Sequence, residues 1–259
     1  MFELAGIIPS AQRNDYLTAF NKGNVLNMIP AINQTAVFFR PASLSSSSVN
    51  PNDFAPPTGE IKSALDQHIK GKQVLVFSGF SGMGYDDVEA FQTSLESTLK
   101  EASLNHGKHN VVVVAGATSV GIGAVYSLAK KLEIKTLGIV SEQAKGGGEI
   151  ASSCDDVIYV PEKKGSWQVL YDIDKAKGLT GSYMTYVASK ASPASGGEFF
   201  AFGGGDVTVS ELKEAKKLGI TTRVYPDFQP NRDKVKERQA NKPGSDMTPV
   251  KTYMTQVLE

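Results

Sequence analysis

The sequence is poor in cysteine, in long apolar runs and in net charge, and each shortage excludes a class of protein. Its single cysteine, Cys154, allows no intramolecular disulfide and no cysteine-based zinc site. Lys plus Arg and Asp plus Glu both total 27, so no overall field favours nucleic acid or an anionic membrane as a partner. No apolar run approaches the ~20 residues that span a bilayer, and the start MFELAGIIPS lacks the pattern of a signal peptide. We therefore expect a cytoplasmic protein.

Histidines are also few, and no spacing such as His-Glu-x-x-His joins them, so we expect no metal and no resident cofactor. The 259 residues, 41% of them hydrophobic, are enough for one large domain with appendages. A stretch rich in Ser and Pro at residues 42–59 predicts a linker. We accordingly divide the chain into an N-terminal extension with its linker (1–59), a main domain (60–228) and a polar C-terminal arm (229–259). The arm is expected to be irregular with at most one short helix, and the extension packs on the main domain or meets a partner subunit.

Short apolar runs alternate with helix-period stretches throughout the main domain. QVLVFSG, NVVVVAG, KTLGIVS, DDVIYVP, EFFAFGG and TTRVYP have the length and the β-branched and aromatic content of strands. Several are followed by amphipathic stretches such as GIGAVYSLAKKLE and VSELKEAKKLG. This order predicts βαβ units, and continuous apolar strands are typical of sheets covered on both faces. The fold class expected is α/β: a doubly wound, mostly parallel Rossmann-like sheet of about six or seven strands with helices on both faces.

Three of the loops that follow these strands are rich in glycine. In doubly wound sheets the ligand lies outside the carboxyl ends of the strands, where such loops meet. Glycine lets backbone N–H groups approach a ligand, and the start of the next helix adds unpaired donors that suit a phosphate. A single loop of this kind often serves only to close the chain, but three equivalent loops favour a site. The candidate phosphate-binding or nucleotide-binding residues are Gly79, Ser81, Gly82, Gly116, Thr118, Gly121, Gly123, Gly203, Gly204, Gly205, Asp206, Val207 and Thr208.

Neither standard nucleotide motif is present, since the chain lacks both G-x-G-x-x-G in this context and the Lys-Ser/Thr pair of a P-loop. Instead, the segment from Gly204 to Glu211, GGDVTVSE, resembles the hallmark P-G-G-x-G-T-x-x-E of the LOG family. Its members are phosphoribohydrolases that release cytokinin base from a nucleoside monophosphate, and they belong to the SLOG superfamily of Rossmann-like domains. The strand, glycine turn and helix of VVVVAGATSVGIGAVYSLAKKLEIKTLGIVSEQ are similar as well. The resemblance covers roughly residues 72–225.

The resemblance implies roles for particular residues. Gly204, Gly205 and Thr208 would cradle the ligand phosphate, and Glu211 would be the carboxylate beside the sugar, where it stabilises an oxocarbenium-like state. The chain departs from the family at Gly203, which replaces the hallmark proline, and at Val207, which replaces its middle glycine.

The family's catalytic Arg-Lys pair is also missing, because Val187 and Ala188 occupy its place and Lys190 is the only cation nearby. Three functions follow from these observations. The first is a SLOG-type binder or sensor of a nucleotide or nucleotide derivative. The second is an active phosphoribohydrolase with Glu211 and Lys190 as catalytic residues. The third is a structural or interaction protein with a vestigial pocket. Because members of the family commonly dimerise, the resemblance also implies a homo-oligomer.

Overall fold

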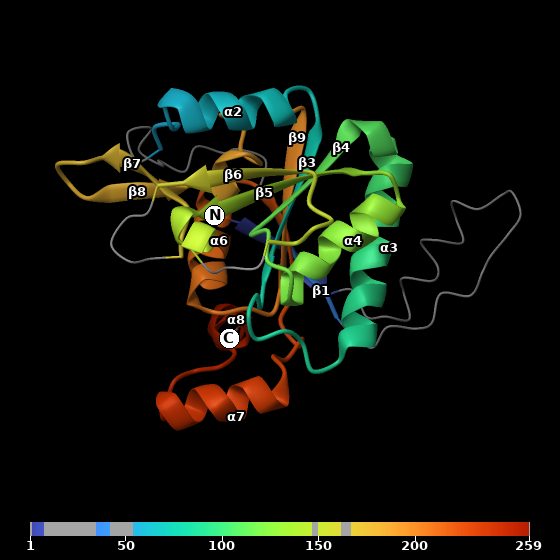
Figure 1. Ribbon diagram of the computed structural model, residues 1–259, viewed down its shortest axis with the longest axis vertical. Helices are drawn as coiled ribbons and strands as arrows, with labels where there is room; N and C mark the ends of the chain where they lie inside the picture. Colours follow the sequence, from blue (N-terminus) through green and yellow to red (C-terminus); the bar gives the residue numbers. More distant parts are fainter. Residues whose placement is uncertain (1, 8–34, 42–53, 147–149, 162–166, 259) are drawn as a thin grey trace, which may run out of the picture.

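The computed structural model describes residues 2–7, 35–41, 54–146, 150–161 and 167–258 of the chain. Within these ranges the chain folds around one large sheet with helices packed on it (Figure 1). No helix in the described part of the chain combines the length and the apolar character that crossing a membrane requires.

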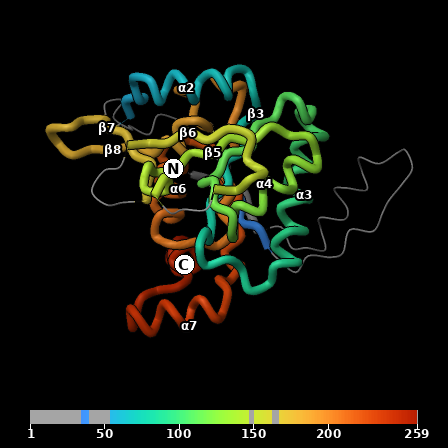
Figure 2. The backbone as a smooth tube through the Cα atoms, in the orientation of Figure 1, coloured from blue at the N-terminus to red at the C-terminus, as the bar shows by residue number. Residues whose placement is uncertain are grey.

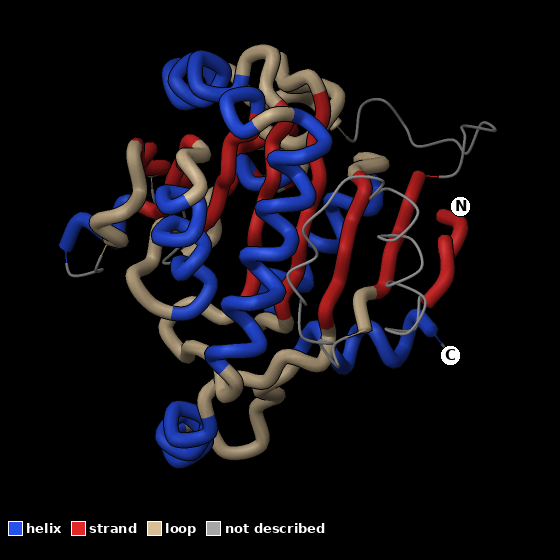
Figure 3. Tube along the Cα trace, turned by 90° about the vertical axis from the view of Figure 1, so that its right-hand side faces the viewer, coloured by secondary structure: helices blue, strands red, loops and turns tan. Residues whose placement is uncertain are grey.

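The main sheet has eight strands in the order β1-β2-β10-β9-β3-β4-β5-β6. Six of them are parallel to one another, whereas β2 pairs antiparallel with β10 and β1 pairs antiparallel with β2. Figure 3 shows these strands side by side, with helices in front of them and behind them. The strands are β1 (Phe2–Ile7), β2 (Val37–Pro41), β3 (Gln73–Gly79), β4 (Val111–Ala115), β5 (Lys135–Ser141), β6 (Asp156–Val160), β9 (Gly196–Phe202) and β10 (Thr221–Tyr225).

The helices cover the two faces of the sheet and create two apolar cores. α3 (Val88–His106) and α4 (Ala124–Lys131) pack on one face, where Phe77 and Phe200 of the strands stack with ring centroids 4.9 Å apart. α2 (Gly59–Ile69), α5 (Tyr183–Tyr186), α6 (Asp206–Lys217) and α8 (Pro249–Leu258) pack on the other face. The runs Val74–Phe77 and Val111–Ala115 are buried throughout, as strands covered on both faces must be. The predicted doubly wound fold is confirmed.

The strand number differs from the six or seven expected, because β1 and β2 extend the sheet beyond β10. Val37 and Phe39 of β2 are buried against the main domain, so this part of the N-terminal segment packs on the domain rather than standing apart from it. A hairpin of β7 (Leu170–Asp174) and β8 (Leu179–Ser182) forms a separate two-stranded sheet, which projects from the body of the molecule (Figure 2). Most of the predicted linker lies outside the described residues, and the division of the chain at 59 and 228 stays a prediction.

The expectation of an irregular C-terminal arm is wrong, because the arm contains two helices of ten residues each. Asn231 caps α7 (Arg232–Asn241) by accepting hydrogen bonds from the backbone amides of Asp233 and Lys234. α8 begins with proline, which suits the first position of a helix, and it buries Val250 and Met254 against α6. The spacing of four residues puts these two side chains on one face of the helix. Their burial lets the helix pack on the domain although most residues of the segment are polar.

Candidate functional site

The order of the strands reverses at one place in the sheet, between β3 and β9. From β3 the chain proceeds through β4 and β5 to β6 on one side, and it returns to place β9 and then β10 on the other. A reversal of this kind opens a crevice at the carboxyl ends of the two central strands, since the helices that follow them lie on opposite faces. The first and third glycine loops follow these two strands, and the second follows the adjacent β4.

The N-terminus of α6 lies at this reversal and carries unpaired backbone donors. Its first three amides, those of Asp206, Val207 and Thr208, have no carbonyl one turn earlier to bond, and no side chain in the described structure caps the helix. Gly205 precedes the helix in an extended conformation, and a Cβ placed there would meet no atom within 4 Å. Val207 adopts helical geometry with its side chain 39% exposed. Three N–H groups without an intrahelical partner therefore follow a residue that has no side chain and open space beside it.

A buried polar cluster lies beneath this helix terminus. The Ser78 hydroxyl at the end of β3 donates to Glu211, with 2.7 Å between Oγ and Oε2, and it lies 3.1 Å from the Thr208 hydroxyl. Thr208 Oγ1 is also 3.5 Å from the carbonyl oxygen of Gly79. All of these side chains are less than a tenth exposed. The cluster joins the second turn of α6 to the carboxyl end of β3, so the candidate carboxylate is held at the reversal.

Burial raises the pKa of Glu211 from its ordinary 4.5 to about 7, although the hydrogen bond from Ser78 lowers it and the charge of Glu214 raises it further. The pKa of Glu214 is also raised by burial, while its carboxylate accepts from the Ser182 amide at 3.0 and 3.2 Å. A buried carboxyl that titrates near neutrality in a crevice is typical of functional sites. Glu211 can therefore serve as a proton donor or acceptor at physiological pH.

Several predicted glycines have a packing role in the structure. A Cβ on Gly121 would lie 2.0 Å from the Phe80 carbonyl oxygen, and one on Gly123 would lie 1.6 Å from that of Thr118. A Cβ on Gly79 would lie 2.2 Å from the Tyr85 hydroxyl. Gly121 lets the loops after β3 and β4 touch through their backbones, whereas Gly123 and Gly79 make room for atoms of their own loops. Contact between them and a ligand stays a prediction.

The third loop departs from prediction in one respect. The amide of Gly203 donates to the Tyr225 carbonyl at 2.9 Å, so it is not available to a ligand as expected. Gly203 and Gly204 have φ angles of +55° and +127°, a region that favours glycine, and a Cβ on Gly204 would lie 2.5 Å from Thr208 Oγ1. Their lack of a side chain shapes the turn, and the free donors begin after them.

The remaining candidates in the first two loops lie at the surface or bond within their own loop. Ser81 and Gly82 are exposed, and Gly82 and Gly116 both have open space where a Cβ would stand. The hydroxyl of Thr118 donates to the Val120 carbonyl at 2.9 Å. Each of the three loops therefore contributes one glycine, Gly82, Gly116 or Gly205, that leaves room beside the backbone.

Lys190 does not lie at this site. The carbonyl of Ala188 lies against Gly197, the second residue of β9, which places Lys190 near the amino end of that strand. Glu211 bonds to Ser78, which pairs with Ala201 near the carboxyl end of the same strand, about 13 Å along it from Gly197. The prediction that Lys190 acts with Glu211 is therefore wrong, and Val187 and Ala188 are buried apolar residues.

The C-terminal arm lies against the first and third loops, which sequence reasoning missed. The Asp86 amide donates to the Gln229 carbonyl at 3.0 Å, and the Arg232 guanidinium pairs with the Asp86 carboxylate at 2.8 Å. Arg238 of α7 donates to the Met83 sulfur at 3.5 Å and has no acidic partner in the described chain. α7 thus brings two arginine side chains to the loop after β3. No local pattern signals this, because the contacts join residues about 150 positions apart.

Fold and site together define a Rossmann-like α/β protein with a buried polar cluster and an uncapped helix start at its strand reversal. Two solved structures of the molybdenum cofactor carrier protein from Chlamydomonas reinhardtii are similar to this chain, at 18% and 16% identity and TM-scores of 0.37 and 0.39. Each similarity covers 72% of this chain and 98% of the other. No protein-family model matches the sequence, and no curated protein is similar enough to count as a relative. At such low identity and loose superposition, the function is argued from the chain's own residues.

Proposed function

We propose that the crevice between β3 and β9 binds a nucleotide or nucleotide derivative, with a phosphate on the amides that open α6. The carrying observation is the uncapped start of this helix, whose three free N–H groups adjoin the open space at Gly205. Unpaired amides and the positive end of the helix dipole attract an anion together.

A nucleotide fits better than a bare anion because acceptors lie beside the donors. Asp206 is exposed at the first position of α6. The negative charge of its carboxylate repels a phosphate, but the carboxylate oxygens can accept a hydrogen bond from a sugar hydroxyl. Glu211 adds a second carboxyl just beneath. Amides that can donate to a phosphate therefore lie next to carboxyl oxygens that can accept from a sugar hydroxyl, and a ribose phosphate carries both groups.

Binding is favoured over hydrolysis of the N-glycosidic bond. Hydrolysis through an oxocarbenium-like state needs an ionised carboxylate at the sugar. Burial raises the pKa of Glu211 to about 7, so the carboxyl is only partly ionised near neutral pH, and the cations of the family pattern are replaced by buried Val187 and Ala188. The protein is therefore proposed to hold its ligand rather than to cleave it.

The test compares Gly205→Val with Ser210→Val. The first variant places a branched side chain over the free amides without a backbone clash, since its Cβ meets no atom and φ is −90°. The second adds the same side chain at an exposed position one turn further along α6. Thermal shifts are measured with nucleoside monophosphates, NAD and ADP-ribose, because a ligand at 100 times its dissociation constant stabilises by about 2.7 kcal/mol.

We expect the wild type and Ser210→Val to be stabilised by at least one nucleotide and Gly205→Val to lose that shift. Equal shifts in both variants would contradict the site. The molybdenum cofactor, after which the similar carrier proteins are named, is a further test ligand. Chromatography for free base separates hydrolysis from binding. No response to any ligand would favour a structural role.

A further inference from the structure

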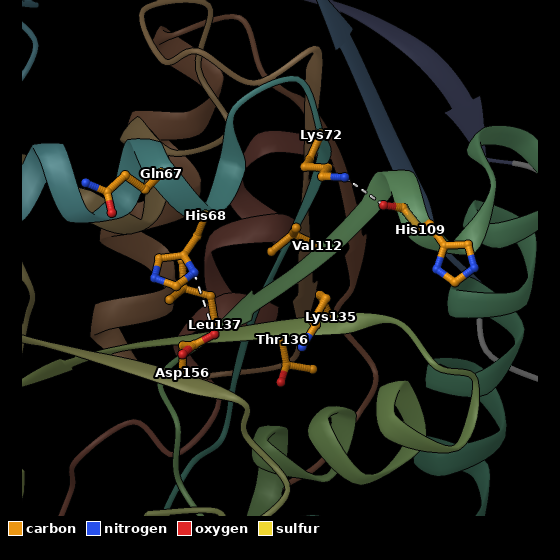
Figure 4. Close-up of a pocket in the computed structure, with 9 residues that line it drawn as sticks. All are labelled: Gln67, His68, Lys72, His109, Val112, Lys135, Thr136, Leu137 and Asp156. Atoms are coloured by element: carbon orange, nitrogen blue, oxygen red, sulfur yellow. Dashed lines mark hydrogen bonds and ion pairs between the residues drawn. The ribbon is translucent and has the colours of Figure 1, made fainter.

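A pocket lies at the opposite end of the strands from the candidate site, at their amino ends. It has a volume of about 220 Å³. It lies between the end of α2 and the starts of β3, β4, β5 and β6 (Figure 4). Its lining includes two lysines and two histidines but only one carboxylate: the residues are Gln67, His68, Lys72, His109, Val112, Lys135, Thr136, Leu137 and Asp156. The crevice described above contributes none of these residues.

The register of the sheet explains why the two lysines share this pocket. Lys135 pairs with Val112 of β4, and Lys72 directly precedes Gln73, which pairs with Val111 on the other side of β4. Side chains alternate along a strand, so Lys72 lies on the same face as Val74 and Lys135 on the same face as Leu137. Both lysines therefore flank Val112 on the face that α2 covers, two strand spacings or about 10 Å apart.

The charges of the pocket are not balanced from within. Lys72 donates one of its three ammonium protons to the His109 carbonyl at 2.8 Å, and the other two have no partner in the described structure. Lys135 has no acidic partner among the described residues. The single carboxylate of the lining, that of Asp156, lies beside the imidazole of His68, with 3.6 Å between Oδ2 and Nδ1. The lining side chains thus supply two ammonium groups and one carboxylate above the apolar floor made by Val112 and Leu137, while the adjoining Asp155 carboxylate is occupied by the amide and hydroxyl of Thr136 at 3.0 and 3.1 Å.

We propose that this pocket binds a small organic anion, whose acidic oxygens lie between Lys72 and Lys135 and whose carbon skeleton rests on Val112 and Leu137. The imidazole of His68, at the end of α2, lines the pocket on the side of the helix and offers a hydrogen bond to the same ligand (Figure 4). Ammonium groups hold carboxylates and phosphates alike, so a carboxylic acid and a phosphate ester are both candidates of this one chemistry.

The experiment is carried out in the Gly205→Val protein, so that an anion bound at α6 does not contribute. Citrate and glycerol phosphate are titrated by calorimetry into this protein and into its Lys72→Met and Lys135→Met derivatives. A Lys70→Met derivative is the matched control, because it removes the same charge from an exposed residue outside the pocket. Each lysine of the pocket is expected to contribute about tenfold to the affinity, as one charge-assisted hydrogen bond does.

We expect the parent protein and Lys70→Met to bind citrate or glycerol phosphate equally, and the two pocket variants to bind about tenfold more weakly. High salt should weaken binding as well, since the charges are partly exposed. Thermal unfolding of each variant checks that it is folded, and Lys135→Glu, which reverses an exposed charge, serves if Lys72→Met unfolds. Failure of both probes to bind at millimolar concentration would overturn the proposal, as would equal affinities in all variants. Loss of nucleotide binding in Gly205→Val leaves this outcome unaffected.

Discussion

Replacing Glu211 by glutamine should stabilise the protein above neutral pH. The pKa of this carboxyl rises from 4.5 to about 7 on folding because the side chain is buried beneath α6. Between these values the folded state keeps the proton that the unfolded state has lost, so stability falls as the pH rises through this range. One pH unit corresponds to 1.36 kcal/mol, and the ionised carboxyl therefore costs about 3 kcal/mol of folding free energy above pH 7.

Glutamine at 211 keeps the shape of the side chain and the hydrogen bond to Ser78 but carries no charge at any pH. Its unfolding free energy, measured by urea denaturation and circular dichroism, should exceed that of the wild type by about 3 kcal/mol at pH 8 and match it near pH 4.5. Glu214 also titrates on folding, but it is present in both proteins and its contribution cancels in the difference.

The control is Glu60→Gln, which neutralises an exposed glutamate of α2. Its stability difference from the wild type should stay within about 0.5 kcal/mol across the whole range. A pH-independent difference for Glu211→Gln would show that the carboxyl is not neutral in the folded protein. Lower stability of that variant at pH 8 would show that the charged form is the one the fold stabilises. Either result would refute the reasoning.

Two further predictions concern the C-terminal arm. Arg238→Met should weaken nucleotide binding about tenfold in calorimetry and leave the melting temperature unchanged, because α7 buries no residue. The control Lys234→Met, on the same helix, should change neither the affinity nor the melting temperature. Equal affinities of the two variants would exclude the arginine from the site. Met254→Ala should lower the unfolding free energy by about 3 kcal/mol in urea denaturation, because this side chain is 1% exposed in the core between α6 and α8, whereas Thr255→Ala at an exposed position should cost less than about 0.5 kcal/mol.

The parallel core of the sheet was predictable because its strands carry their own signal. Val111–Ala115 is apolar at every position, and only a strand covered on both faces needs that composition. β2 gave no comparable signal. Its residues Val37, Phe38 and Phe39 pair with Val224, Arg223 and Thr222, about 185 positions away, and nothing local specifies such a partner. The antiparallel edge was missed for this reason.

The helices of the arm were missed because the overall composition of the segment is polar. Pro249 at a helix start, followed by Val250, Met254 and Val257, has the spacing of an amphipathic helix. The many polar residues around this stripe suggested an irregular segment. α7 lacks any such stripe, and it depends instead on the Asn231 cap and on contacts with the loop after β3.

At the candidate site, the sequence predicted donors from Gly203 to Thr208, and the structure narrows which of these amides lack a partner. Three consecutive glycines suggested a cradle of amides, yet Gly203 bonds to β10 and Gly204 makes room for Thr208, so the free donors are those of the helix itself. Which amide is already occupied depends on the neighbouring strand, and that strand is set by tertiary structure. Composition alone cannot supply this information.

The environment of Glu211, by contrast, can be read from the spacing of its neighbours. Thr208, Leu212 and Ala215 form the buried face of α6, and position 211 lies on the same stripe, three residues after 208 and four before 215. A glutamate at a core position violates the apolar pattern of its own helix, and such a violation is tolerated where function compensates for it. If Glu211→Gln proves more stable and also binds nucleotide with a flatter pH dependence than the wild type, the carboxyl at this position is retained for the ligand and not for the fold.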